Sequence, residues 1–224
     1  MDHTKAQELS AVRNLSGSTA VEAALGTGAV VLTILALANV YPFLLASIAT
    51  IAVGAAFLIQ GMAISADFNM VMSEATRNQR DAISLAGDLS AEFMGGIAGI
   101  VLGILSLINV SPTTLLPIAA IVFGSTLFLG AGTTANLSRM QIEGEPEMSE
   151  NMQYLAGRAI KASAGAQILV GLGSITLGII AVISITVNPL LLSLVAVLSV
   201  GAIEFTKGSL LSAKMMSLFN NRNR

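Results

Sequence analysis

Three long stretches without a charged residue dominate the pattern of this chain. They run from Glu22 to Asp67, from Glu92 to Arg139 and from Lys161 to Glu204. About 20 apolar residues, rising about 1.5 Å each, are enough to cross the roughly 30 Å hydrocarbon layer of a membrane. Each stretch is therefore about twice as long as one spanning helix requires, and it predicts two helices joined by a turn.

A proline motif in the middle of each stretch predicts where the turns lie. The motifs NVYP, NVSP and TVNP end at Pro42, Pro112 and Pro189. Proline lacks a backbone N–H and restricts the residue before it, so one helix ends ahead of it and the next can begin with it. We expect the side chains of Asn39, Asn109 and Asn188 to hydrogen-bond backbone groups left free at these turns.

The predicted fold is all-α and integral to the membrane, with six transmembrane helices arranged as three tandem hairpin repeats. The hairpins are expected at about 15–68, 85–138 and 155–215, within a single membrane domain covering residues 1–224. The sequence LSG at Leu15 and the sequence LAG at Leu85 and Leu155 recur at equal intervals, which indicates an internal repeat. Gly157 lies farther from its proline than Gly17 and Gly87 lie from theirs, so the fifth helix should be longer.

Composition supports a membrane location and excludes several function classes. Hydrophobic residues make up 54% of the chain, charged residues 11%, and the mean hydropathy is +0.80. The 11 Lys and Arg residues nearly cancel the 13 Asp and Glu residues, so no basic field favours nucleic acid. Cysteine is absent, which removes disulfides, thiolate metal sites and cysteine nucleophiles. No cofactor or metal is predicted.

The positions of the basic residues predict the orientation of the helices. All 11 lie in the termini, in or within three residues of the connections at about 69–88 and 139–158, or at the end of the last helix. By the positive-inside rule, both termini and both connections should be cytoplasmic and the proline turns should lie outside. Another interpretation of the first segment is a signal peptide, because Ala36-Leu37-Ala38 resembles a cleavage site.

The second hairpin carries a resemblance to a known family. Its sequence, GGIAGIVLGILSLINVSPTTLLPIAAIVFGSTLFLG, combines spaced glycines, a proline turn and a glycine twelve residues later. This pattern resembles the short tandem membrane repeat of the HdeD acid-resistance protein family. The resemblance covers roughly residues 15–213 and implies a stress-associated protein of the prokaryotic cytoplasmic (inner) membrane, with no assigned reaction and no ligand residues.

Glycines at recurring positions are predicted to pack the helices together. Small residues let helix backbones approach closely, which drives association where the solvent is lipid. The predicted packing residues are Gly26, Gly54, Gly96, Gly99, Gly103, Gly124, Gly173 and Gly201. They can serve contacts within one bundle, contacts between copies of the chain, or both.

Glu204 is the polar residue that stands out within a predicted span. Counted from the proline of each hairpin, the equivalent residues of the other two are Phe57 and Leu127. In one interpretation, Lys207 pairs with Glu204 on the same helix face and reaches toward the interface. In the other, Glu204 faces the bundle interior near Gln60 and titrates.

Other polar segments are interpreted as structural. Glu22 and Glu92, each at the same distance before its proline, are expected near helix N-termini at the interface. The acidic stretch EGEPEMSE at 143–150 indicates a solvated turn rather than a divalent-cation site. Residues 70–89 form an amphipathic pattern typical of a helical connection lying on the membrane surface or against other loops.

These patterns favour a protein that is not an enzyme. No paired carboxylates, histidine cluster or nucleophile–base set falls within the predicted spans. We expect a non-catalytic, self-associating scaffold or stress component whose partners are the lipid bilayer and copies of itself or other membrane proteins. The alternative is a small channel or proton-coupled transporter that uses Glu204, Lys207 and Gln60.

Overall fold

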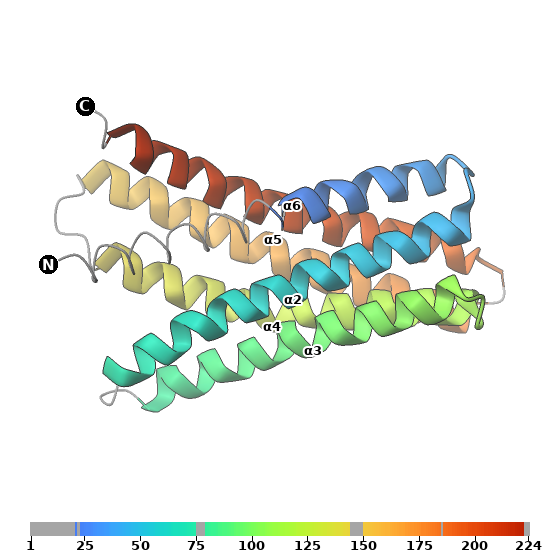
Figure 1. Cartoon of the computed structure of the whole chain (residues 1–224), viewed down its shortest axis with the longest axis horizontal. Helices are drawn as coiled ribbons and strands as arrows, with labels where there is room; N and C mark the ends of the chain where they lie inside the picture. Colours follow the sequence, from blue (N-terminus) through green and yellow to red (C-terminus); the bar gives the residue numbers. More distant parts are fainter. Residues whose placement is uncertain (1–20, 22, 75–78, 144–149, 185, 222–224) are drawn as a thin grey trace, which may run out of the picture.

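The computed structural model describes residues 21, 23–74, 79–143, 150–184 and 186–221, and within these ranges the fold is all-helical (Figure 1). The N-terminal helix covers Ala23–Leu37. It is followed by α2 (Pro42–Glu74), α3 (Gln79–Leu107), α4 (Pro112–Glu143), α5 (Glu150–Ile183) and α6 (Pro189–Asn221). The prediction of an all-α protein is therefore confirmed.

Four of these helices are long and apolar enough to cross a membrane. The suitable segments are Pro42–Met62, Pro112–Ala131, Ala162–Ile183 and Pro189–Lys207. Two further apolar segments, Ala23–Leu37 and Ala91–Leu107, are shorter. The helices extend well beyond these segments: α2 has 33 residues, which corresponds to about 50 Å at about 1.5 Å per residue.

The long helices replace the connections that the sequence pattern predicts. Residues 70–89 do not form a separate surface helix, because α2 continues to Glu74 and α3 begins at Gln79. The amphipathic pattern there belongs to the ends of two long helices. In the other predicted connection, α4 continues to Glu143 and α5 begins at Glu150, and most of the acidic stretch lies outside the described residues.

The first two proline turns share one backbone geometry. Asn39 and Asn109 both have φ of 65°, in the left-handed region. The N–H of Val40 donates to the carbonyl of Leu35 at 3.1 Å, and the N–H of Asn39 donates to that of Ala36 at 3.0 Å. This is the pair of hydrogen bonds of a Schellman motif, in which a left-handed residue closes the helix end. Asparagine tolerates this conformation better than most residues, so here its backbone, not its side chain, explains its presence.

The third turn is built differently. The side-chain Oδ1 of Asn188 accepts a hydrogen bond from the backbone N–H of Leu190 at 3.0 Å, which caps the start of α6. The predicted side-chain role therefore applies to Asn188. Five residues separate α5 from Pro189, whereas four separate the corresponding helices at Pro42 and Pro112.

The hairpins are arranged as a ring, with three inner helices at its centre. The inner helices α2, α4 and α6 contact one another, whereas α3 contacts only α2 and α4, and α5 contacts only α4 and α6, among the helices α2 to α6. The most extensive contacts join α2 to α3 and α4 to α5, across consecutive hairpins. Figure 1 shows the proline turns gathered at one end and the helices fanning out toward the other end.

Glycines make the contacts between consecutive hairpins, and they do so at equivalent positions. A Cβ added to Gly96 would lie 2.7 Å from the backbone nitrogen of Leu58, and one added to Gly171 would lie 2.9 Å from that of Phe128. A Cβ added to Gly26 would lie 2.6 Å from the backbone nitrogen of Phe205. Leu58, Phe128 and Phe205 occupy equivalent positions, counted from the proline of each hairpin. The contact of Gly26 with α6 therefore closes the ring by joining the first hairpin to the third.

Most of the predicted packing glycines lie in these contacts. Gly54 and Gly124 face the backbones of α3 and α5, Gly99 faces the ring of Phe123, Gly103 lies against Ile51, and Gly201 approaches the N-terminal helix more loosely. Gly173 is the exception, because an added Cβ would have no described neighbour within 4 Å. Gly171 occupies the position predicted for Gly173, since the third hairpin has two extra residues between this glycine and its proline.

The core lies where the inner helices meet. It consists of three layers, each made of equivalent positions in the three hairpins: Ala49, Ala119 and Ala196; Val53, Phe123 and Val200; Phe57, Leu127 and Glu204. The rings of Phe57 and Phe123 pack with their centroids 5.6 Å apart. All nine residues are buried, and Glu204 is the polar one among them.

The glycine contacts predict that added volume will be tolerated at some glycines and not at others. Gly99→Leu should destabilise the bundle by about 1–3 kcal/mol, because its side chain would displace the Phe123 ring from the core. Gly28→Leu should leave stability unchanged, since a Cβ there meets no described atom within 4 Å. Thermal unfolding of both variants in mild detergent checks this, and equal midpoints would contradict the packing role of Gly99.

Candidate functional site

Glu204 lies on the axis of the bundle, in the layer farthest from the proline turns. Its exposed fraction is 0%. The equivalent residues of α2 and α4 are Phe57 and Leu127, which are also buried. A buried carboxylate in an apolar layer is costly unless charged or hydrogen-bonding partners surround it, so its contacts decide what this site can do.

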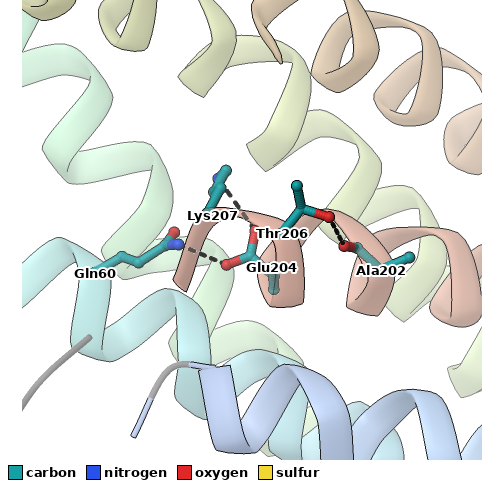
Figure 2. Close-up of polar contacts among 5 residues, drawn as sticks. All are labelled: Gln60, Ala202, Glu204, Thr206 and Lys207. Carbon is teal, nitrogen blue, oxygen red and sulfur yellow. Dashed lines mark hydrogen bonds and ion pairs between the residues drawn. The ribbon is translucent and has the colours of Figure 1, made fainter. Parts of the chain in front are cut away.

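Both carboxylate oxygens of Glu204 have a partner (Figure 2). Its Oε2 accepts a hydrogen bond from Nε2 of Gln60, on α2, at 2.6 Å. Its Oε1 accepts one from Nζ of Lys207, on α6, at 3.1 Å, which is also an ion pair. Hydrogen bonds with a charged partner are stronger than neutral ones. The site therefore ties α6 to α2.

The positions of the partners follow from the helix geometry. Lys207 lies three residues after Glu204, a spacing that brings two side chains onto one helix face. Gln60 and Lys207 occupy equivalent positions after their prolines, where α4 has Gly130 and so contributes no side chain. The Lys207 side chain is 16% exposed, and its Nζ lies 6.0 Å from the centroid of the Phe57 ring.

The structure thus joins the two interpretations that the sequence left open. Glu204 pairs with Lys207 on its own helix, and it also faces the interior and contacts Gln60. Lys207 lies about one helical turn beyond the buried carboxylate, on the side away from the proline turns. The three candidate functional residues form one connected cluster.

Glu92 has a different environment from the one predicted for it. We expected it at a helix N-terminus, but α3 begins at Gln79, so Glu92 lies thirteen residues inside the helix. The helix dipole acts only over the first turn and does not explain it. Glu92 is buried, and its neighbour Phe93 lies against Gly61 of α2, where a Cβ added to the glycine would be 3.1 Å from the Phe93 nitrogen. Glu92 therefore lies at the depth of Gln60.

Sequence reasoning missed Gln167 on α5. Gln167 lies four residues before Gly171, as Glu92 lies four residues before Gly96, and it is buried. Counting back from the prolines hid this equivalence, because the third hairpin has two extra residues in that interval. The usable signal was the spacing to the packing glycine, which the structure identifies as Gly171.

The rest of the axis offers no continuous polar path among the described residues. Between Glu204 and the proline turns, the core layers contain valine, phenylalanine and alanine. The buried hydroxyls of Thr33, Thr50 and Thr126 donate to carbonyls four residues earlier in their own helices. No group of three or more His, Cys, Asp or Glu side chains suitable for a metal occurs in the described part of the chain.

Comparison of the chain with protein-family models, curated proteins and solved structures finds no match.

The pairing predicts a specific pattern of stabilities. Glu204→Leu should destabilise the bundle by about 3 kcal/mol or more, because it removes the buried carboxylate that pairs with the Lys207 charge. Lys207→Met should also destabilise it, because it leaves a buried carboxylate without its cation. The double variant should recover most of the loss, since neither charge remains. Thermal unfolding of the four proteins measures this coupling, and additive losses would contradict it.

Proposed function

We propose that this chain is a six-span membrane protein built from three tandem hairpins, with both termini in the cytoplasm of a prokaryotic cell. The four long apolar helices support this, and so do the two shorter apolar segments. Ala23–Leu37 and Ala91–Leu107 contact α6 and α2 through Gly26 and Gly96, in the same way that Ala162–Ile183 contacts α4 through Gly171. Because these three contacts are equivalent, the two shorter apolar segments should cross the membrane at the same depth as Ala162–Ile183.

We propose that its function is structural: it assembles with copies of itself or with other membrane proteins and does not catalyse a reaction. The observation that carries this proposal is the outer face of α5. Gly165 and Gly173 lie eight residues apart on this helix, and a Cβ added to either meets no described atom within 4 Å. Open glycines on a lipid-facing surface let a second helix approach closely.

The resemblance to the HdeD family leads us to propose a role in acid stress. The support is the repeat itself, with its spaced glycines and proline turns. An assembly of small membrane hairpins is consistent with such a role, and no reaction needs to be assigned.

The second candidate function is proton-coupled transport or ion conduction, and the burial of Glu204 favours it. Ionisable residues within spans commonly belong to transport pathways. The apolar layers between Glu204 and the turns argue for the structural function, because they close the axis. Glu204→Gln separates the two functions: proton flux into proteoliposomes stays unchanged if the role is structural and falls if Glu204 carries protons.

The orientation can be tested with single cysteines, because the chain has none of its own. Asn188→Cys and Thr113→Cys should react with an impermeant thiol reagent added outside intact cells, since both lie at turns assigned to the outside. Ser84→Cys and Ser149→Cys should react only after the cells are opened. The reverse pattern would refute the orientation, and labelling at all four sites in intact cells would refute the six-span arrangement.

Two neighbouring glycines test the structural function. Gly173→Leu should keep the melting temperature of the single chain but lower the fraction of oligomers, because the added side chain blocks a contact between chains. Gly171→Leu is the matched control and should lower the melting temperature, since its Cβ would lie 2.7 Å from the carbonyl oxygen of Gly124. Size-exclusion chromatography with light scattering in mild detergent measures the oligomers. An unchanged distribution for Gly173→Leu would rule out self-association through this face.

A further inference from the structure

The inner face of α5 carries two polar side chains without a hydrogen-bond partner. Gln167 is 1% exposed, and neither its Nε2 nor its Oε1 has a partner. Ser174, seven residues later on the same face, is also 1% exposed, and its Oγ has none. Ser174 differs from Thr33, Thr50 and Thr126, whose hydroxyls bond to their own helices.

Leaving these groups unsatisfied is expensive. Each buried donor or acceptor without a partner has lost its hydrogen bonds to water and has gained none in exchange. Between Gln167 and Ser174, α4 meets this face through the backbone of Gly124 and through the backbone and Cβ of Phe128, none of which is a side-chain hydrogen-bonding group. Lipid cannot supply them either, since its tails neither donate nor accept hydrogen bonds. The two side chains lie about 10 Å apart along α5, at about 1.5 Å per residue, so each needs its own small molecule that both donates and accepts.

The position of Gln167 along α5 gives a second reason to expect a polar ligand there. Glu92 occupies the equivalent position on α3, four residues before its own packing glycine, and it is also buried. Gly171 lies against Phe128, and Gly26 lies against Phe205, the residue after Glu204. Because Phe128 and Phe205 are equivalent, Gln167 lies within about one helical turn of the depth of Glu204. The polar residues of three different helices therefore occur at one depth.

We propose that Gln167 and Ser174 each bind water between α5 and the inner helices, with Gln167 as the site to test. Water is the ligand because the amide and the hydroxyl are neutral and because water both donates and accepts hydrogen bonds. The amide atoms are covered in the present packing, so water enters by a small separation of α5 from α4. We expect water to enter from the end opposite the proline turns, where the helices fan out (Figure 1). The inference goes beyond the structural function and rests on α5 crossing the membrane.

Two single-cysteine variants, two residues apart, give a sharp test. Leu169 is 72% exposed on the outer face of α5 and would face lipid, whereas Gln167 is covered. In proteoliposomes, the permeant reagent N-ethylmaleimide should label Gln167→Cys at least about tenfold faster than Leu169→Cys, because the reactive thiolate forms only where water reaches it. Exposure alone predicts the opposite order. Asn188→Cys in a turn is the fast control, and Ala119→Cys in the core is the slow one.

Each result decides the question. Labelling of Gln167→Cys as slow as that of Ala119→Cys overturns the water site and leaves the six-span proposal intact. Labelling of Leu169→Cys as fast as that of Asn188→Cys overturns the span of α5 and the site with it. A second measurement avoids cysteine: Gln167→Leu should lower the melting temperature in detergent, because it removes groups that water satisfies. A melting temperature equal to or above that of the original protein would overturn the site, since deleting truly unpaired groups is neutral or stabilising.

Discussion

The bundle depends on the close approach of helix backbones at glycine. In lipid, hydrophobic burial does not drive helices together, so dispersion contacts between closely packed backbones must do so. Gly96, Gly171 and Gly26 each bring an outer helix onto the inner helix of the preceding hairpin, the last of them by closing the ring. Since each contact involves backbone atoms, no side chain can move aside to admit a larger residue. The arrangement of the three hairpins follows from these contacts more than from the turns within each hairpin.

The ring determines which residues meet on its axis. Equivalent positions of α2, α4 and α6 form layers, and a residue that differs in one hairpin has unlike neighbours in the other two. Glu204 is such a residue, because its counterparts Phe57 and Leu127 are apolar. It is stabilised by Lys207 from its own helix and by Gln60 from the next inner helix. Breaking the repeat at one position has thus produced a single polar cluster, held by two helices, at one end of an apolar axis.

The sequence predicted the helices because charge-free length and proline position have direct physical consequences. It predicted the site only as a set of candidates, because the partner Gln60 lies 144 residues from Glu204 and no local pattern joins them. The distance to Pro189 points to Gly173 rather than Gly171, because two extra residues in the third hairpin shift the register of packing. The ends of α2 and α3 look like a surface connection in the sequence, because an amphipathic pattern is the same in both settings. Contacts between helices tell a packing glycine from its neighbour and the end of a long helix from a surface connection. The spacing of the repeats alone does not encode those contacts.

The contrast between the two ends of the bundle bears on what the molecule does. Toward the proline turns, the inner helices meet through alanine and leucine, and the buried hydroxyls of Ser47 and Ser106 bond to each other across α2 and α3 at 2.7 Å. Toward the other end, the layer of Glu204 is followed by Gln60 and Lys207, with Glu92 and Gln167 on the outer helices at similar depth. Among the described residues, the buried ionisable side chains occur only at this second end, whereas the buried polar groups near the turns are neutral hydroxyls. A polar layer of this kind is suited to anchoring the bundle where the helices separate, and water bound at Gln167 would belong to that layer without opening a path across the membrane.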